Sequence, residues 1–183
     1  MSARAQARAP DGVSMTSESH EGLVVRRTGS GPLLVLFHGG RGSWNHWIHN
    51  IPALSHRHTV LALDLPGFGA SVKVPRDLPF DEYVALVARS VSSMTAGASF
   101  SLAGFSFGSQ TAAALAAGRL QDRVRRLSLL APSGWGDDGQ AARALRRTLK
   151  GVTGAAERLN VLRHNLAATQ IADPAGVSNE TLA

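Results

Sequence analysis

The sequence predicts an α/β fold, built on a doubly wound sheet whose strands are mainly parallel. Two observations lead to this class: apolar runs of strand length recur along the chain, and segments with helical spacing alternate with them across short links. Several of these runs are apolar at consecutive positions, as expected of strands that are buried on both faces of a parallel sheet.

The strands are expected where apolar residues crowd between turn-forming residues. The run Leu33–Phe37 is the clearest, because every one of its positions is apolar. The last expected strand is stopped by Pro132 and Gly134, which are residues typical of turns. In chain order the expected strands are Gly22–Arg27, Leu33–Phe37, Thr59–Leu63, Phe100–Ala103 and Val124–Leu130.

The helices are expected between these strands. The segment from Phe80 to about Met94 has apolar residues at helical spacing, and Pro79 is available for its first turn. The segment Phe107–Leu120 is rich in alanine and is also expected to be a helix. Between residues 44 and 54 apolar residues recur at three- and four-residue steps, which indicates helical or irregular packing against the sheet.

The two ends of the chain differ from this central pattern. Residues 1–20 are rich in Ala, Ser and Arg without apolar periodicity, so we expect a disordered leader, with either Met1 or Met15 as the start. From Gln140 to about Ala168 the sequence predicts Arg-rich helices and no strand. The expected organisation is therefore a leader over 1–20, a core over 21–138 and a helical segment over 139–183.

The composition excludes several classes of function. The 183 residues are 44% hydrophobic and 17% charged, which suits one globular domain. There is no cysteine, so disulfides, zinc-thiolate sites and a cysteine nucleophile are excluded. No apolar run approaches the roughly 20 residues that span a bilayer. The first twenty residues also lack the apolar stretch of a secretory signal, so we expect a cytoplasmic protein without a membrane partner.

The positive charge does not by itself predict a nucleic-acid partner. The chain has 19 Lys+Arg against 13 Asp+Glu, a formal net charge of +6. Arg143, Arg146 and Arg147 would form one stripe on a helix, which is typical of a solvated face. No aromatic residues are interleaved with these arginines to stack on bases, so we expect no nucleic acid among the partners.

One motif carries chemistry. Gly104-Phe105-Ser106-Phe107-Gly108 lies between an expected strand and an expected helix. A sharp turn there would hold Ser106 in a strained conformation, and glycines two residues to either side leave the room that such a turn needs. The turn would place the Ser106 hydroxyl at the positive end of the following helix, where an oxyanion is favoured. The alternative is a tight turn that only links strand to helix.

Acyl transfer from a serine also needs backbone N–H groups that face the developing oxyanion. One would be the amide of Phe107, which follows the serine. The second is expected from the glycine-rich loop after Leu33–Phe37, where Gly40 is the preferred donor and Gly39 and Arg41 are the alternatives. His38, at the start of this loop, is expected to brace it rather than to act as a base.

These segments, taken in order, resemble the α/β-hydrolase fold superfamily. The likeness rests on Leu33–Phe37, His38-Gly39-Gly40, the turn Asp64–Gly69 and the Ser106 motif, and it covers about Gly22 to Ala131. The nearest branch is that of single-chain serine hydrolases with a helical cap. The resemblance implies that Asp64 shapes its turn and is not the catalytic acid. It also implies that the helices after residue 139 begin the cap.

The resemblance further implies a catalytic acid and then a histidine, on loops that follow later strands. Asp137 and Asp138 follow the last expected strand and are candidates for the acid, with loop-solvating carboxylates as the alternative. His164 is the only histidine after Ser106 and is a candidate base, with a surface or cap-lining residue as the alternative.

The chain ends inside the segment that resembles a cap. We therefore expect a C-terminally truncated member of the family, without the two later strands. The strand Val124–Leu130 would then be an unpaired apolar edge, which invites self-association.

Two functions follow as expectations. The first is a serine hydrolase that acts on an ester, acyl or C–C bond of a small-molecule substrate, with no metal and no organic cofactor. The alternative is a hydrolase-like chain that is catalytically incomplete, because it lacks the acid and the histidine of the triad.

Overall fold

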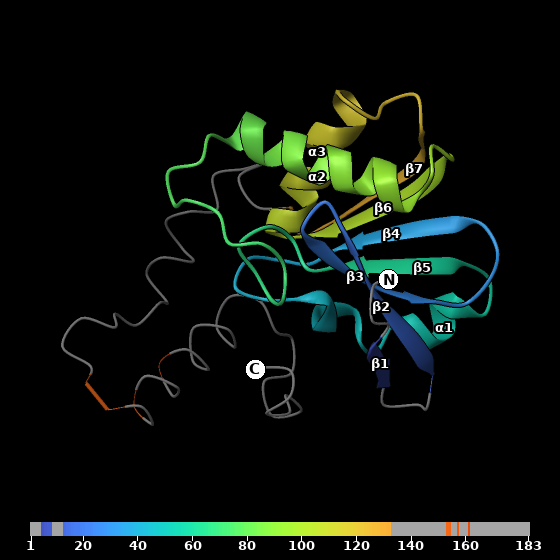
Figure 1. The fold of residues 1–183 in the computed structure, drawn as a ribbon, viewed down its shortest axis with the longest axis horizontal. Coiled ribbons are helices and arrows are strands. Elements are labelled where there is room, and N and C mark those ends of the chain that lie inside the picture. Colours follow the sequence, from blue (N-terminus) through green and yellow to red (C-terminus); the bar gives the residue numbers. More distant parts are fainter. Residues whose placement is uncertain (1–4, 9–12, 133–152, 155–156, 158–160, 162–183) are drawn as a thin grey trace. The chain divides into compact units, whose positions relative to one another are not determined.

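The computed structural model describes residues 5–8 and 13–132, together with 153, 154, 157 and 161 (Figure 1). Seven strands form one mixed sheet in the order β1-β2-β3-β5-β4-β6-β7. The strands are β1 Ala5–Arg8, β2 Ser14–His20, β3 Leu23–Thr28, β4 Leu33–Phe37, β5 Thr59–Leu63, β6 Phe100–Phe105 and β7 Val124–Leu130. The helices are η1 Trp44–Trp47, α1 Ile51–Ser55, α2 Phe80–Met94 and α3 Phe107–Ala117.

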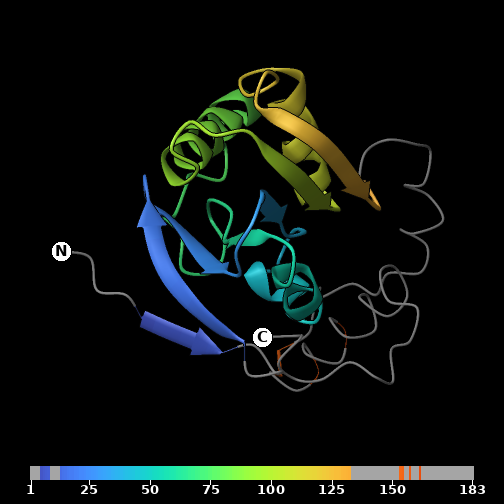
Figure 2. The ribbon, with the colours of Figure 1, turned by 90° about the vertical axis from the view of Figure 1, so that its right-hand side faces the viewer.

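The predicted α/β class is confirmed. The pairs β4–β5, β4–β6 and β6–β7 are parallel, and the antiparallel pairs lie on the N-terminal side of the sheet. Figure 2 shows this side, with the blue strands β1 and β2, well away from the orange strand β7. The five expected strands are all present, within one or two residues of their expected bounds.

Alternate residues of the central strands build two separate cores. Val35 and Phe37 of β4 belong to a cluster with residues of α2 and α3, whereas Leu34 and Leu36 belong to a second cluster with η1 and α1. Because successive side chains of a strand point to opposite faces, helices cover both faces of the sheet, as a doubly wound fold requires. Full burial of a side chain such as Phe37 contributes about 1.5–3 kcal/mol.

The N-terminal segment corrects one expectation. A disordered leader was predicted over residues 1–20, but Ser14–His20 forms β2, which pairs antiparallel with β3 from Thr16↔Arg27 to His20↔Leu23. Met15 is fully buried in the second cluster. Backbone pairing can order a strand whose side chains are mostly polar, so the lack of apolar alternation was misleading here.

The two helices predicted over Phe80–Met94 and Phe107–Leu120 are present, and the second ends earlier than expected. α2 begins directly after Pro79 and carries two acidic residues, Asp81 and Glu82, in its first turn, where they complement the helix dipole. α3 begins at Phe107 as predicted but ends at Ala117, because Gly118 follows in a non-helical conformation.

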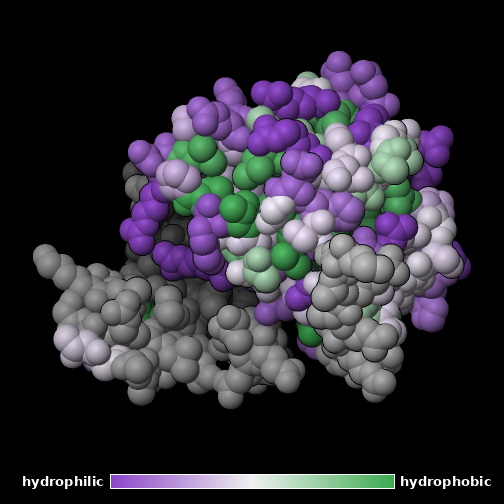
Figure 3. All heavy atoms as spheres, in the orientation of Figure 1, coloured by the Kyte–Doolittle hydropathy of each residue, from purple (hydrophilic) through white to green (hydrophobic). Residues whose placement is uncertain are grey.

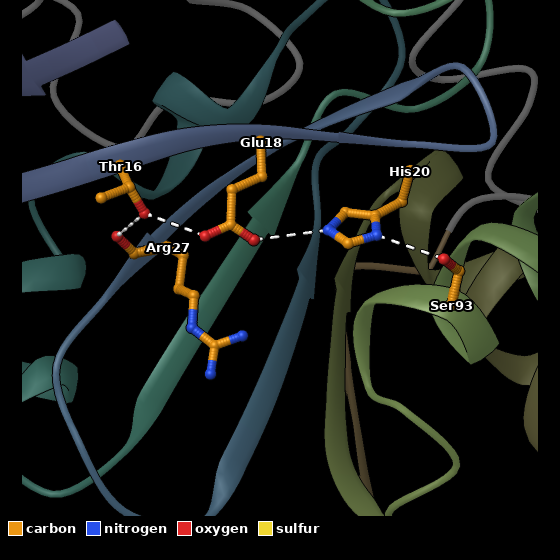
Figure 4. A network of polar contacts seen from close by, with 5 residues as sticks. All are labelled: Thr16, Glu18, His20, Arg27 and Ser93. Atoms are coloured by element: carbon orange, nitrogen blue, oxygen red, sulfur yellow. Dashed lines mark hydrogen bonds and ion pairs between the residues drawn. The ribbon is translucent and has the colours of Figure 1, made fainter. Parts of the chain in front are cut away.

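A polar network joins β2 to the last turn of α2 (Figure 4). The His20 ring lies between two partners, with Nε2 3.3 Å from Glu18 Oε2 and Nδ1 3.2 Å from Ser93 Oγ. The Thr16 hydroxyl donates to the other oxygen of Glu18, at 3.2 Å. The network therefore fixes the C-terminal end of β2 against a helix that is distant in the sequence.

The strand β7 pairs only with β6 within the part of the chain that the structure describes. Two of its leucines are well exposed, Leu127 at 40% and Leu130 at 42%. On the face seen in Figure 3 hydrophobic residues are interspersed with hydrophilic ones over α2 and α3. No helix in the described residues is long and apolar enough to cross a membrane.

The chain divides into two units, Met1–Ser133 and Gly134–Ala183. The sequence placed the boundary between residues 138 and 139. Nearly all of the second unit lies outside the described residues, and the predicted helical cap falls there.

Candidate functional site

Ser106 occupies a strained turn between β6, which ends at Phe105, and α3, which begins at Phe107. Its φ is 53° and its ψ −116°, a combination that L-residues rarely adopt and that costs about 1–3 kcal/mol. Neighbouring backbone holds the turn in place, because the Ser106 N–H donates to the Leu130 carbonyl at 2.9 Å and the Ser106 carbonyl accepts from Ser109 N–H at 2.9 Å.

The Ser106 side chain does not serve as a helix cap. A serine at the N-cap of a helix usually accepts a hydrogen bond from an N–H of the first turn. Ser106 is at this position in α3, yet its hydroxyl makes no such bond. Helix capping, the simplest structural role for a serine at this position, therefore does not explain Ser106.

The two glycines of the motif are required by space. A Cβ at Gly104 would lie 2.6 Å from the Gly108 carbonyl carbon, and one at Gly108 would lie 2.5 Å from the His38 carbonyl oxygen. Both neighbours are backbone, which cannot move aside cheaply. Glycine at these two positions is therefore needed for β6 to approach α3 and for α3 to approach the end of β4.

Ser109 supports the same turn and was missed by the sequence reasoning. Its buried hydroxyl lies 2.6 Å from the Gly104 carbonyl oxygen and 3.0 Å from that of Leu130. It thereby links β6, α3 and β7 below Ser106. A serine directly after the motif gives no sequence signal of its own, because serine is common near helix starts.

The loop after β4 lies against this turn. A Cβ at Gly39 would be 3.0 Å from Phe105 Cδ1 and 3.2 Å from Ser106 Cβ, and one at Gly40 would be 3.7 Å from Phe107 Cβ. The structure thus brings together the three residues that the sequence selected for nucleophile and oxyanion hole: Ser106, Phe107 and Gly40. Phe107 is the first residue of α3, so its N–H has no acceptor within the helix.

His38 braces the loop through both of its ring nitrogens. Nδ1 donates to the Gly39 carbonyl at 2.7 Å, and Nε2 accepts from the Leu65 N–H at 2.9 Å. The side chain is fully buried, and this burial lowers the pKa of His38 below its usual value. A neutral imidazole with both nitrogens engaged has no free site to take a proton from Ser106.

The Gly39 N–H is also engaged, since it donates to His46 Nδ1 at 3.1 Å. Of the three candidate donors in this loop, the Gly39 N–H is therefore occupied. The N–H groups of Gly40 and Arg41 make no hydrogen bond within the described residues. The loop turns at Arg41, whose φ is 63°, and the turn is closed by a 3.3 Å bond from Gly42 N–H to the Gly39 carbonyl.

Asp64 holds the neighbouring turn rather than a catalytic group. Its carboxylate accepts from the Trp44 N–H at 2.8 Å and from the Ala70 N–H at 3.0 Å, and the side chain is only 2% exposed. Its own carbonyl accepts from the Ser71 hydroxyl at 2.6 Å. These contacts join the segment after β5 to the start of η1, as the resemblance implied.

Aromatic rings fix the first turn of α3. The Phe107 ring packs against Phe68 and Tyr83, with ring centroids 6.2 Å and 5.5 Å away. Tyr83 is buried, which raises the pKa of its hydroxyl, and that hydroxyl donates to the Pro66 carbonyl at 3.2 Å. With its side chain anchored in this way, Phe107 has a backbone amide that is held beside Ser106.

The remaining candidates are not placed. Asp137, Asp138 and His164 lie outside the described residues. Within residues 13–132 no hydrogen bond joins the Ser106 hydroxyl to an imidazole or a carboxylate. The described residues also contain no group of three or more metal-ligating side chains that could hold a metal ion.

Comparison with known proteins places this geometry in a family. The model of the alpha/beta hydrolase fold matches residues 32–163, which include the loop after β4, the Asp64 turn and the Ser106 turn. The chain belongs to the α/β-hydrolase fold family. Within this family, the α/β-hydrolase chain is 37% identical over 154 residues to the dihydrolipoyllysine-residue acetyltransferase component of an acetoin cleaving system from Pseudomonas putida.

The α/β-hydrolase chain is shorter than its relatives. The match to the Pseudomonas putida protein covers 83% of this chain and 39% of that protein. A protein of the same description from Cupriavidus necator is 35% identical over 142 residues, 72% of this chain and 37% of the relative. The chain thus spans about two fifths of the length of these curated relatives.

Solved structures give the same fold. Cfl2 from Burkholderia cenocepacia has a TM-score of 0.68 at 22% identity, over 98% of this chain and 63% of that one. An alpha/beta superfamily hydrolase from Oenococcus oeni PSU-1 has a TM-score of 0.58 at 23% identity, over 63% and 44% of the two chains. At this identity the likeness concerns the fold alone.

Proposed function

We propose that this chain carries the nucleophile and the oxyanion hole of a serine hydrolase. The observation that carries the proposal is the conformation of Ser106, which is held at φ 53° at the start of α3 with its hydroxyl unused as a cap. Strain of this kind persists only where surrounding structure enforces it, and it clusters at active sites. The glycine-rich loop that lies against Ser106 supports the same interpretation.

The proposed reaction begins with attack of Ser106 Oγ on a substrate carbonyl carbon. The C=O electron pair moves to oxygen, and the amides of Phe107 and Gly40 donate to the resulting oxyanion. Collapse breaks the bond to the leaving group and leaves an acyl-serine, which water then hydrolyses. The serine proton must pass to a base, for which His164, with Asp137 or Asp138 as its acid, remains the candidate in this chain.

The proposed substrates are small molecules with an ester, another acyl group or a cleavable C–C bond. Relatives named as a pimeloyl-[acyl-carrier protein] methyl ester esterase and a pyrrolizixenacetamide deacetylase support acyl chemistry. Relatives named as epoxide hydrolases match over shorter segments. We further propose that the protein acts in the cytoplasm, needs no metal or organic cofactor, and can self-associate through the edge of β7.

The second candidate function is a hydrolase-like chain that cannot turn over. It is supported by the residues that the structure describes, among which no imidazole is hydrogen-bonded to Ser106. A serine without a base is weakly nucleophilic at neutral pH, although an oxyanion hole alone still accelerates reaction.

Covalent labelling tests the proposed nucleophile. The full chain is incubated with a fluorophosphonate probe, beside Ser106→Ala and, as a matched control, Ser93→Ala at an exposed serine of α2. We expect wild type and Ser93→Ala to be labelled and Ser106→Ala to remain unlabelled. A folded wild-type protein without label would contradict the proposal.

Turnover separates the two candidate functions. Hydrolysis of a p-nitrophenyl ester is measured for wild type, Ser106→Ala and His164→Ala. A serine hydrolase gives steady turnover that Ser106→Ala abolishes. The incomplete chain gives at most one equivalent of p-nitrophenol per Ser106, followed by no further release. If turnover survives in His164→Ala, that histidine is not the base.

A further inference from the structure

His46 is a half-buried histidine to which neither the sequence nor the proposed reaction assigns a role. It is part of η1, next to Trp47, and its ring packs behind the loop that follows β4. Its Nδ1 accepts the Gly39 N–H at 3.1 Å. A Cβ at Gly42 would clash with the imidazole ring, so the loop folds closely over it.

The same ring reaches the turn that holds the candidate nucleophile. The centroids of His46 and Phe105 are 5.7 Å apart, in an edge-to-face arrangement, and Phe105 directly precedes Ser106. On its other side His46 lies 5.9 Å from the His38 ring, also edge-on. His46 thus contacts both the loop after β4 and the turn of Ser106, the two segments that must be aligned to bind an oxyanion.

The two histidines hold Gly39 from both sides with opposite chemistry. His38 Nδ1 donates to the Gly39 carbonyl, and His46 Nδ1 accepts from the Gly39 N–H. The Gly39 carbonyl and the Gly40 N–H belong to one planar peptide group, which is trans because no cis bond is present in the described residues. Fixing Gly39 at both ends therefore fixes the direction of the Gly40 N–H.

We infer that His46 is a positioning residue, which holds the loop of Gly39 and Gly40 in register with Ser106 by accepting the Gly39 N–H. It touches no reacting atom and acts through Gly39. The inference rests on the proposed function, since it assumes that Gly40 donates to an oxyanion formed on Ser106.

The role requires a neutral imidazole, because a protonated ring has no lone pair to accept the Gly39 N–H. Burial, and then the neighbouring His38, lower the pKa of His46 to about 4. The acceptor is therefore present at neutral pH. With Nδ1 accepting, the proton of the neutral ring is on Nε2.

An isosteric pair of variants tests the acceptor separately from the packing. His46→Asn keeps an acceptor oxygen close to the place of Nδ1, whereas His46→Leu has the same shape and no acceptor. His46→Phe keeps an aromatic ring against Phe105 without an acceptor. His49→Phe, at an exposed histidine three residues later, is the matched control.

The readout is the second-order rate constant for fluorophosphonate labelling of Ser106 in the full chain. We expect His46→Leu and His46→Phe to be slower by about 10- to 100-fold, since small misplacements of reacting groups have effects of this size. His46→Asn is expected within about threefold of wild type, and His49→Phe at the wild-type rate. Equal rates for His46→Leu and wild type, or for His46→Leu and His46→Asn, would overturn the inference.

A spectroscopic readout keeps the inference testable if a variant does not fold or if labelling fails. In the 15N-labelled wild-type chain we expect the Gly39 amide proton to be protected from exchange, and its resonance to move in His46→Leu and return toward wild type in His46→Asn. A Gly39 amide that exchanges at the intrinsic rate of an unprotected amide overturns the inference. Absence of wild-type labelling with a protected Gly39 amide contradicts the proposed function instead.

Discussion

Two places in this molecule bring a serine close to histidines, and they differ in almost every physical respect. At the junction of β2 and α2, Ser93, His20 and Glu18 form a continuous chain of side-chain contacts, partly open to solvent (Figure 4). At the turn before α3, the buried His38 and the half-buried His46 are bound to backbone groups, and neither is hydrogen-bonded to Ser106.

A serine–histidine–carboxylate contact chain is therefore not by itself a hydrolytic site. Ser93 is near the C-terminal end of α2, where the helix dipole opposes negative charge, whereas Ser106 is at the N-terminal end of α3, where the dipole favours it. Only Ser106 is beside a loop that can offer a backbone amide. What prepares a serine for attack on a carbonyl is therefore the geometry of the backbone around it.

The largest change in the free energy of unfolding is expected from the glycines that enforce the Ser106 turn. Gly108→Ala should lower the free energy of unfolding by about 3 kcal/mol or more, because its Cβ would meet backbone atoms of Phe37 and His38 at 2.5–2.6 Å. Gly97→Ala, just after α2, should cost only about 1 kcal/mol, since it has open space and a φ of +79°. Chemical denaturation measures both. Equal costs at the two sites would show that the turn is not under steric constraint.

The next effect concerns the support behind the turn. Asp64→Ala should lower the free energy of unfolding by about 2–3 kcal/mol, because it leaves the Trp44 and Ala70 N–H groups without their acceptor. Asp64→Asn keeps one acceptor oxygen and should lose less. Thermal melts of the two variants check this order. An Asp64→Ala variant as stable as wild type would contradict the structural role of this carboxylate.

The sequence predicted the parts of the fold that depend on apolar patterning. The strands β4, β5 and β6 are runs such as Leu33–Phe37 that are buried on one or both faces, and the Ser106 motif follows from the spacing of two glycines. β2 was missed because six of its seven residues are polar and only Met15 is anchored in a core. Its order comes from backbone pairing with β3, which leaves no trace in hydropathy.

The supporting residues of the site were beyond sequence reasoning for a similar reason. His46 and Ser109 act through contacts with backbone groups that are brought together only by the packing of β4, β6, β7 and α3. Neither residue has a distinctive spacing from Ser106 or Gly39. His38 differs, because its place directly after a buried strand already indicated a bracing role.

The pH dependence of the free energy of unfolding tests whether His38 and His46 are neutral in the folded chain. The pKa of His46 falls from 6.5 to about 4 on folding, so between these values the unfolded chain binds more protons than the folded chain. The free energy of unfolding should therefore decrease as pH falls from about 6.5 to about 4, by at most about 3 kcal/mol for this residue. His38, whose pKa is also lowered by burial, adds a decrease of the same sign.

Urea denaturation at pH 7, 5.5 and 4.5 measures this dependence. His46→Asn, which cannot titrate in this range, should show a shallower decrease than wild type, whereas His49→Asn at an exposed position should not. A wild-type slope unchanged in His46→Asn would contradict a neutral, half-buried imidazole at this position.

The smallest effect is expected at the second serine–histidine contact. His20→Ala removes both ring contacts, to Glu18 and to Ser93, but these groups are accessible to water. Partly exposed contacts of this kind contribute about 0–1 kcal/mol, so the loss in the free energy of unfolding should stay within that range. The labelling rate of Ser106 should be unchanged. A His20→Ala chain that lost its reactivity toward fluorophosphonate would reverse the comparison between the two sites.

The most direct test of the central claim is to map the residue that a fluorophosphonate probe modifies in the folded wild-type chain. Chymotrypsin cleaves after aromatic residues such as Phe100 and Phe105, which lie between the two serines, so peptide mass spectrometry of this digest distinguishes the peptide that contains Ser106 from the one that contains Ser93. The predicted result is a single adduct on Ser106, formed only while the protein is folded. An adduct on Ser93, or no adduct on a chain shown to be folded, would contradict the assignment of Ser106 as the nucleophile.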